Sequence, residues 1–319
     1  MHPPTHPLHI TIYGAGAIGS LLGAHLSRTH HVTLIGHPPH ITTIQQHGLT
    51  ITGHTHYHAT IPAHTTLTTT HPSPDLIIVT VKAYDTPTAA TDIKKILTPS
   101  TTVLSLQNGL GNIETLQTHI PSNQLIAGVT THGARLTTPG TVTHTGTGTI
   151  TIGELTGTRT TRIHTIATAM RTSGLPTTIS TDITTDLWKK TIANAAINPL
   201  TAYFTCPNST LLSNPILRHT TDHIITESTH IAHAAGITIQ EQTMKKLTYS
   251  IIRTTAHNHS SMLQSLEQGK RTEIDALNGT LATIATHHHL QAPLNTLLTS
   301  LIHWKEHQTI SEKTLGDHP

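Results

Sequence analysis

A strand-like segment that runs directly into three glycines constrains the fold of this 319-residue chain more than any other feature. Residues 8–13 alternate and are rich in β-branched side chains, which is typical of a strand. Gly14, Gly16 and Gly19 follow, and an apolar helical pattern continues through residues 20–26. In this order the first glycine permits a tight turn, the second lets the backbone approach a pyrophosphate, and the third lets helix and strand pack closely. Glycines also occur in plain turns, but the flanking strand and helix favour dinucleotide binding.

The rest of the first half is patterned as a doubly wound sheet. Apolar runs with strand character occur at residues 31–35, 75–82 and 101–106. From Val129 to Ile152, short Thr/Gly-rich alternating segments indicate antiparallel strands that finish the sheet. A helix over residues 159–173 and a short strand over 177–179 are expected to complete this half.

The second half is patterned as helices only. From residue 183 onward an apolar period of 3.6 residues dominates, and no strand pattern returns. Capping residues, glycines and prolines place the main helices at residues 186–198, 214–236, 240–257, 272–284 and 293–304. Pro199 lacks a backbone N–H and is expected to end the first of these helices at about Asn198.

These patterns predict an α/β protein of two domains. An N-terminal Rossmann-type dinucleotide-binding domain is expected over residues 1–181, followed by an all-helical substrate and catalytic domain over residues 182–319.

Polar side chains recur at every fourth residue of the first C-terminal helix, at Lys190, Asn194 and Asn198. Steps of four residues drift by about 40° around a helix, so the three side chains line one face. The residues between them are almost all apolar, which would bury most of the remaining surface. Such a stripe either solves a packing problem, with satisfied core amides and a lysine that extends to water, or binds a polar ligand.

Lys82 and Asn108 follow two successive buried strands, at the strand ends where open α/β sheets bind ligands. Asn-Gly is also a common turn sequence, so for Asn108 the structural and the functional interpretations both stay open.

The end of the strand over residues 31–35 bears on the choice of cofactor. An NAD-specific site places an acidic residue there to bind the ribose 2′-hydroxyl. This sequence reads Gly36-His-Pro-Pro-His40 and contains no acid. The missing carboxylate leaves room for a 2′-phosphate and favours NADP, with His37 and His40 as candidate partners and Arg28 as the nearest arginine.

Composition limits the partners and the cellular compartment that the protein is expected to have. A formal net charge of +2 gives no reason to expect nucleic acid or an anionic membrane as a partner. The single cysteine, Cys206, excludes an intrachain disulfide and favours a reducing compartment. The N-terminus lacks the pattern of a signal peptide, and no apolar run is long enough to span a bilayer. We therefore expect a soluble cytoplasmic protein.

The chain contains 30 histidines, so a single histidine carries less information than usual. No Cys-x-x-Cys or His-Glu-x-x-His motif is present, and no carboxylate lies among His287, His288 and His289. We expect no structural metal.

Several motifs in one order make a more specific pattern. They are Gly14-x-Gly16-x-x-Gly19, Val79-Thr-Val-Lys82-Ala, Gln107-Asn108-Gly, Leu187-Trp-Lys-Lys190-x-x-x-Asn194-x-x-x-Asn198-Pro, Cys206-Pro-Asn208, Ser260-Ser-Met-Leu263 and Gly269-x-Arg-Thr-Glu273-Ile-Asp. With these motifs over nearly its whole length, the chain resembles the ketopantoate reductase (2-dehydropantoate 2-reductase) family. The resemblance implies NADPH-dependent reduction of 2-dehydropantoate to (R)-pantoate, a step toward pantothenate and coenzyme A.

The resemblance also implies roles for individual residues. Lys190 would be the catalytic lysine, with Glu273 as its partner. The residues implied around the substrate are Asn194, Asn198, Asn208 and Ser261. Those implied along NADP(H) are Gly14, Ala15, Gly16, Ala17, Ile18, Gly19, His37, Lys82, Asn108, Ala134 and Glu273.

Two positions depart from the family pattern. His37 stands where the family commonly has an arginine for the 2′-phosphate, and Ser265 stands where it often has an aspartate. Three other readings stay open: a reductase of another 2-keto acid, a non-catalytic NADP-sensing Rossmann protein, and a histidine-rich metal-binding protein. The partner is expected to be a small molecule, and the protein a monomer or a homodimer.

A histidine as the phosphate ligand predicts pH-dependent cofactor binding. NADPH affinity is expected to rise as the pH falls through about 6.5, because histidine gains its positive charge there. The KM for NADPH, measured between about pH 5.5 and 8, tests this expectation, and a flat profile would contradict it.

Overall fold

The computed structural model describes residues 6–69 and 71–316, with side chains described as far as residue 309. The chain separates into two compact units. The first comprises the residues up to Gln107 together with Asn112–Asp186, and the second comprises Asn108–Gly111 together with the residues from Leu187 onward. Residues 1–5, on which the expectation of no signal peptide partly rests, lie outside the described residues.

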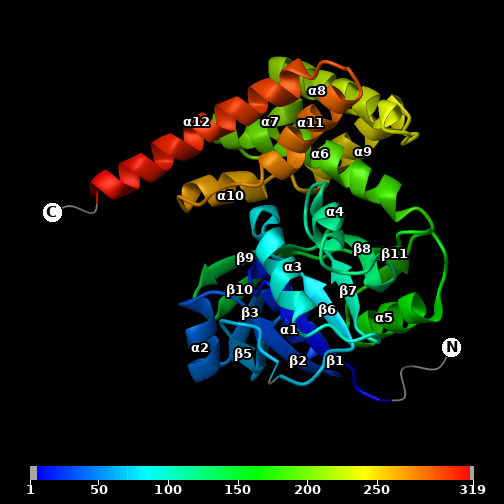
Figure 1. The fold of residues 1–319 in the computed structure, drawn as a ribbon. Helices are drawn as coiled ribbons and strands as arrows, with labels where there is room; N and C mark the ends of the chain where they lie inside the picture. Colours follow the sequence, from blue (N-terminus) through cyan, green and yellow to red (C-terminus); the bar gives the residue numbers. More distant parts are fainter. Residues whose placement is uncertain (1–5, 70, 317–319) are drawn as a thin grey trace. The chain divides into compact units, whose positions relative to one another are not determined.

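The first unit contains the expected doubly wound sheet (Figure 1). Its strands are β1 (His9–Tyr13), β2 (His31–Ile35), β5 (Ala63–His64), β6 (Leu76–Val79), β7 (Thr102–Ser105), β8 (Leu125–Thr130), β11 (Ile150–Glu154) and β12 (Thr177–Ile179). They follow the order β12-β11-β8-β7-β6-β1-β2-β5, and only the β11–β8 pair is antiparallel. The helices of this unit are α1 (Ala17–Leu26), α2 (His40–His47), α3 (Thr86–Lys94), α4 (Asn112–Gln117) and α5 (Thr161–Thr172).

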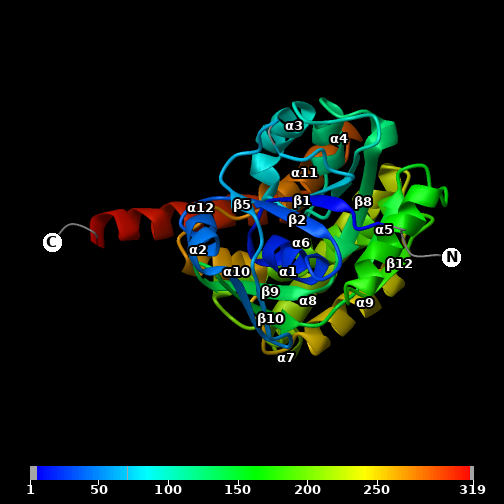
Figure 2. The ribbon, with the colours of Figure 1, turned by 90° about the horizontal axis from the view of Figure 1, so that it is seen from below.

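A second, four-stranded sheet covers α1. It consists of β3 (Leu49–Gly53), β4 (Tyr57–Ala59), β9 (Gly133–Thr138) and β10 (Thr141–Gly146), in the order β4-β3-β10-β9. Strands β9 and β10 lie beside α1 (Figure 2). The prediction that residues 129–152 finish the first sheet is therefore wrong for β9 and β10. Alternation identifies a strand but does not identify its partner, and here the partner β3 lies about 90 residues earlier in the chain.

The packing of α1 explains its composition. Leu21, Leu22 and Leu26 of α1 share one core with Leu34 of the first sheet and with Ile51 of the second. Because sheets lie on opposite sides of it, α1 is apolar around nearly its whole circumference.

The second unit is helical, as expected (Figure 1). It contains most of α6 (Ile183–Phe204), followed by α7 (Thr210–Ser213), α8 (Pro215–Ala234), α9 (Glu241–Thr254), α10 (Ser261–Glu267), a π-helical turn (Asp275–Gly279), α11 (Thr280–His287) and α12 (Pro293–Gly316). Among the described residues no helix is long and apolar enough to cross a bilayer.

Two helices begin with side-chain N-caps, as their sequences Asn214-Pro215 and Ser260-Ser261 indicate. The Asn214 side chain accepts hydrogen bonds from the first-turn N–H groups of α8, and the Ser260 hydroxyl accepts one from Leu263 N–H in α10. The last helix does not end near Trp304. α12 continues to Gly316, because neither glycine nor proline interrupts residues 305–315.

The expected stop at Pro199 is also wrong, since α6 runs through this proline to Phe204. Pro199 cannot donate to the carbonyl of Ala195, four residues earlier. The side chain of Asn278, in the π-helical turn, donates to that carbonyl at 3.1 Å. Asn278 is fully buried, and its amide group also donates to Asn295 Oδ1 at 2.9 Å. A donor from a distant segment therefore supplies the hydrogen bond that the proline removes.

α6 ends where the chain turns into a left-handed conformation. Thr205 has φ 52°, and Cys206 N–H donates to Thr201 O at 3.1 Å, as in a Schellman motif. The Lys305 ammonium donates to the Tyr203 carbonyl and to Thr205 Oγ1, which satisfies the helix end with a cation.

Replacing Asn278 tests whether it compensates for Pro199. Asn278→Ala is expected to lower the free energy of unfolding by about 1–3 kcal/mol, because it leaves the Ala195 carbonyl unsatisfied. In a Pro199→Ala background residue 199 regains its N–H, so the same change should cost about 1 kcal/mol less. Urea unfolding of the four proteins of this cycle measures the coupling.

Thr283→Ala is the matched control for that cycle. The Thr283 side chain is exposed and bonds to the Gly279 carbonyl within the adjoining helix turn, so its loss should change little. An equal cost of Asn278→Ala with and without Pro199 would contradict the compensation.

Candidate functional site

The turn after β1 requires two of its glycines for close packing. Gly14 has φ 113°, and a β carbon there would lie 2.5 Å from Val81 N, just beyond β6. A β carbon at Gly19 would lie 2.2 Å from Gly14 O. The N–H groups of Gly14 and Ala15 both donate to Ile35 O, which ties the turn to the end of β2. Close packing at the glycines and the two hydrogen bonds to Ile35 O therefore hold this turn against the ends of β2 and β6.

Gly16 is different, because a β carbon there would meet no protein atom within 4 Å. Gly16 is also the N-cap of α1, and no side chain caps the N–H groups of the first turn. Free N–H groups and the positive end of the helix dipole suit an anion. β1 lies between β2 and β6, at the point where the strand order reverses and ligands of such sheets bind. The residues present therefore fit a pyrophosphate.

Of the three candidate ligands for a 2′-phosphate, only His37 is placed where it could reach one; His40 and Arg28 are engaged elsewhere in the fold. His37 is exposed just after β2. His40 is buried, where Nδ1 accepts from Gly140 N–H and Nε2 bonds to Ser20 Oγ, each at 2.9 Å. The expectation for His40 is wrong, because both ring nitrogens are used inside the fold and burial lowers its pKa.

Arg28 is also wrong as a candidate. It follows the C-terminus of α1, at the helix end away from the glycine turn, and its guanidinium lies over the ring of Tyr57.

Lys82 directly follows the loop after β6 and precedes a 3₁₀ turn over Ala83–Asp85. Gln107 holds this loop in place, a role that the sequence did not predict. The buried Gln107 side chain donates to Val81 O at 3.2 Å and to Thr86 Oγ1 at 2.7 Å. Its position directly after a buried strand was the available signal.

Asn108 and Ala134 lie in different parts of the fold. Residues 108–111 group with the helical unit, where Leu110 N–H donates to Ala276 O at 3.0 Å. Ala134 lies on β9 of the second sheet, opposite His144 of β10.

Lys190 and Glu273 are brought together in the helical unit. Lys190 is partly buried on α6, and Glu273 is 7% exposed just before the π-helical turn. Burial lowers the pKa of Lys190 to about 8, and the Glu273 carboxylate acts in the opposite direction. Such a lysine still carries its proton at neutral pH and releases it more readily than an exposed one.

Asn194 and Asn198 follow Lys190 on the same helix, and Asn198 is buried. Among the described residues, neither side chain has a hydrogen-bond partner. Within the described residues neither amide is used to satisfy a neighbouring protein group, so the stripe remains a candidate for binding a polar ligand.

Asn208 and Ser261 follow α6 in the sequence. Asn208 Nδ2 donates to Thr255 Oγ1 at 2.9 Å, and its buried Oδ1 has no partner among the described residues. Ser261 is exposed at the start of α10, whereas its neighbour Ser260 is buried and caps that helix. The hydroxyl of Ser265, the departure from the family pattern, donates to Ser261 O.

Several histidines gather in the first unit. His132 Nδ1 lies 3.3 Å from His144 Nε2, and His25 lies close by. Burial, with His144 and His25 nearby, lowers the pKa of His132 to about 4. Within the part of the chain that the structure describes, no three or more His, Cys, Asp or Glu side chains are grouped so as to hold a metal ion.

Two family models match the chain in succession. The model of ketopantoate reductase PanE/ApbA matches residues 10–157, and the model of its C-terminal region matches residues 182–306. The chain belongs to the ketopantoate reductase family. This is a family of oxidoreductases.

Relatives of this family member align over nearly their full length. A 2-dehydropantoate 2-reductase of Pyrococcus horikoshii is 39% identical over 94% of this chain and 98% of its own, and one of Halobacterium salinarum is 34% identical over 92% and 98%. Among solved structures, D-mandelate dehydrogenase with NADH and anilino(oxo)acetate has a TM-score of 0.90 at 25% identity, over 95% of this chain and 99% of its own.

Glycine substitutions separate packing from ligand binding in this reductase-family chain. Gly16→Ala is expected to keep the fold, because its β carbon meets no protein atom, and to weaken NADPH binding by about tenfold or more if a pyrophosphate approaches there. Calorimetric titration with NADPH and thermal unfolding measure the two effects.

Gly19→Ala serves as the contrast, because its β carbon would clash with Gly14 O and lower the melting temperature. Unchanged NADPH affinity in Gly16→Ala would rule out a pyrophosphate at this turn.

Proposed function

We propose that the protein reduces 2-dehydropantoate to (R)-pantoate with NADPH, a step toward pantothenate and coenzyme A. The observation that carries the proposal is Lys190, a partly buried lysine with a pKa of about 8 that interacts with the Glu273 carboxylate. Membership of the ketopantoate reductase family supports the substrate.

The chemistry of ketone reduction calls for such a lysine. Hydride addition to the carbonyl carbon builds negative charge on the oxygen, which a nearby cation stabilises and a proton neutralises. Lys190 can supply both the charge and the proton. We assign it as the general acid and Glu273 as the group that orients its ammonium.

The amide and hydroxyl groups around Lys190 are assigned to the rest of the substrate. Asn194 and Asn198 follow the lysine at intervals of four residues on α6, and their unpartnered side chains support this role. With Asn208 and Ser261 they would bind the carboxylate and the hydroxyl of 2-dehydropantoate. Neutral ligands add no further negative charge beside Lys190, so its ammonium can still interact with the carbonyl oxygen.

The bound cofactor supplies the hydride, and the protein supplies its position. We assign the glycine turn over residues 14–19 to the pyrophosphate, and Lys82, Asn108 and Ala134 to the remainder of the cofactor. The absence of an acid after β2 and the exposure of His37 support NADP over NAD. NADH, which D-mandelate dehydrogenase binds in its solved complexes, is the rival cofactor.

A second candidate is the reduction of another 2-keto acid. The likeness to D-mandelate dehydrogenase and the serine at position 265 favour it. Rates with 2-dehydropantoate far below those with other 2-keto acids would select this candidate.

We further infer a cytoplasmic enzyme that acts as a monomer or a homodimer. The single cysteine, Cys206, supports a reducing compartment.

Lys190→Ala is expected to lower the rate of NADPH oxidation with 2-dehydropantoate at least about 100-fold, the scale of a lost general acid. In the wild type, kcat should decline as the pH rises through about 8, because Lys190 then loses the proton it donates. The loss of NADPH absorbance under saturating substrate measures both effects.

Lys189→Ala is the matched control, since it removes the ammonium of the adjacent residue. Lys189 is rotated by about 100° around the helix axis from Lys190 and so lies off the face that carries Lys190, Asn194 and Asn198. Equal losses in the two variants would refute the assignment of Lys190. NADPH binding without turnover on any 2-keto acid would leave a nucleotide sensor as the better reading.

A further inference from the structure

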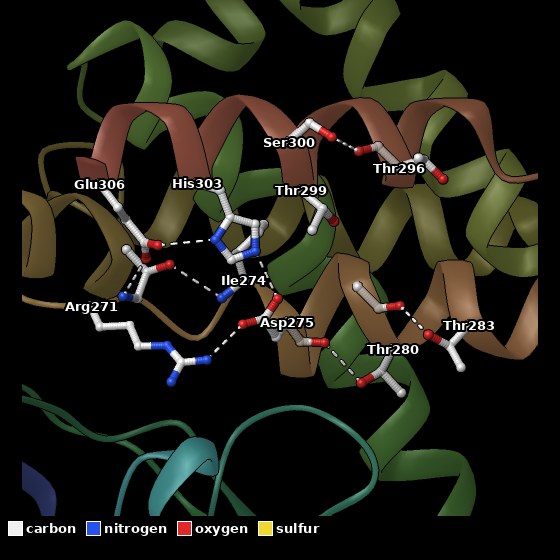
Figure 3. A network of polar contacts seen from close by, with 12 residues as sticks. Arg271, Ile274, Asp275, Thr280, Thr283, Thr296, Thr299, Ser300, His303 and Glu306 are labelled. Carbon is white, nitrogen blue, oxygen red and sulfur yellow. Dashed lines mark hydrogen bonds and ion pairs between the residues drawn. The ribbon is translucent and has the colours of Figure 1, made fainter. Parts of the chain in front are cut away.

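α12 contacts the short segment that carries Glu273 at one residue that precedes Glu273 and at one that follows it in the sequence (Figure 3). On one side, Thr272 N–H donates to Glu306 Oε1 at 2.6 Å. On the other, Asp275 Oδ1 lies 2.8 Å from His303 Nε2. His303 and Glu306 are three residues apart and therefore lie on one face of α12. Two contacts from one helix thus fix the residues immediately around Glu273.

His303 joins these contacts into one network. Its Nδ1 lies 3.2 Å from Glu306 Oε2, so the imidazole bridges the two carboxylates (Figure 3). An imidazole donates to both only when both nitrogens carry protons. Arg271 adds a second cation, 3.0 Å from Asp275 Oδ2. Burial alone would raise the pKa of Asp275, but hydrogen bonds from Arg271 and His303 hold it below its ordinary value.

Two other carboxylates on helices that pack against α12 bond to groups other than His303. Glu227 of α8 accepts from the backbone of Leu294 and Asn295, and Glu267 of α10 bonds to His259. The charges that face His303 are therefore those of Asp275, Glu306 and, through Asp275, Arg271.

The backbone between the two anchors has little freedom. Ile274 N–H donates to Thr272 Oγ1, and the N–H groups of Ala276 and Leu277 donate to the carbonyl of Glu273. Thr272 and Ile274 are almost completely buried. The backbone of Glu273 is therefore held by its neighbours, and from this position its carboxylate interacts with Lys190.

We propose that Glu306 and His303 are positioning residues, which act through residues 272–275 to keep the Glu273 carboxylate near the Lys190 ammonium. This inference rests on the proposed function of Lys190 as general acid. Its consequence is a change in the pH range of the reaction, because Glu273 favours the charged form of Lys190.

Glu306→Ala tests the proposal most directly, because it removes the acceptor of Thr272 N–H and one partner of His303. The alkaline limb of the kcat profile is expected to move to lower pH by on the order of one unit. The reason is that a carboxylate farther from Lys190 stabilises its protonated form less, which lowers the pKa of Lys190. Glu306→Gln keeps a neutral acceptor at the same place and should restore part of the shift. His303→Ala should move the limb in the same direction.

Ser300→Ala is the control on the same helix, since its exposed hydroxyl donates to the Thr296 carbonyl one turn earlier (Figure 3). It should leave the pH profile where it is. A lower kcat in Glu306→Ala with an unmoved alkaline limb would show a merely structural role and would overturn the proposal.

A readout independent of turnover separates this proposal from the proposed function. The pH dependence of acetic anhydride labelling at Lys190, followed by peptide mass spectrometry, reports its pKa even in an inactive protein. A lower midpoint in Glu306→Ala supports the positioning role, and equal midpoints overturn it. If Lys190→Ala keeps its activity while this midpoint shifts, the proposed function fails and the coupling stands.

Discussion

The hydrogen bond from Asn278 to the carbonyl of Ala195 decides how the helical unit is built. A proline in a helix interior costs about 3 kcal/mol or more, in part because one carbonyl loses its partner. Here the partner comes from a buried amide, and α6 stays helical from Ile183 to Phe204. Lys190, Asn194 and Asn198 then remain on one face. If the helix had ended at Asn198, this last amide would have lain in the final turn of the helix, where fraying would hold it less firmly relative to the lysine.

The same amide connects other helices of this unit. Asn278 donates to Asn295 Oδ1, and Asn295 Nδ2 in turn donates to Glu227 Oε1 of α8. These side chains are buried or partly buried, so each bond is formed away from competing water. The π-helical turn that carries Asn278 begins two residues after Glu273. Asn278 therefore ties one end of the segment to α6 and, through Asn295, to the start of α12 and to α8. Thr272 and Asp275 tie the other end, around Glu273, to residues 303 and 306 of α12.

Much of this fold could be predicted from the sequence because its determinants are local. The strand before Gly14, the apolar strand at residues 76–79 and the caps at Asn214 and Ser260 all depend on neighbours within a few residues. The errors arose where the partner was distant. Pro199 is compensated by a side chain about 80 residues later, and β10 pairs with a strand about 90 residues earlier.

The candidate site follows the same rule. Spacing alone placed Lys190, Asn194 and Asn198 on one face, but only the resemblance to a family pointed to Glu273. Nothing in the local sequence showed that His40 would be buried between Ser20 and Gly140. The anchors His303 and Glu306 were also invisible, because they act on a segment about 30 residues earlier.

The transfer of hydride to a ketone carbon is the central claim, and isotopic labelling tests it most directly. The protein would be given 2-dehydropantoate and NADPH deuterated at the transferred position of the nicotinamide, and the product would be examined by NMR. The account predicts (R)-pantoate with deuterium on the carbon that bore the ketone. Unlabelled product, or no product while another 2-keto acid receives the deuterium, would contradict it.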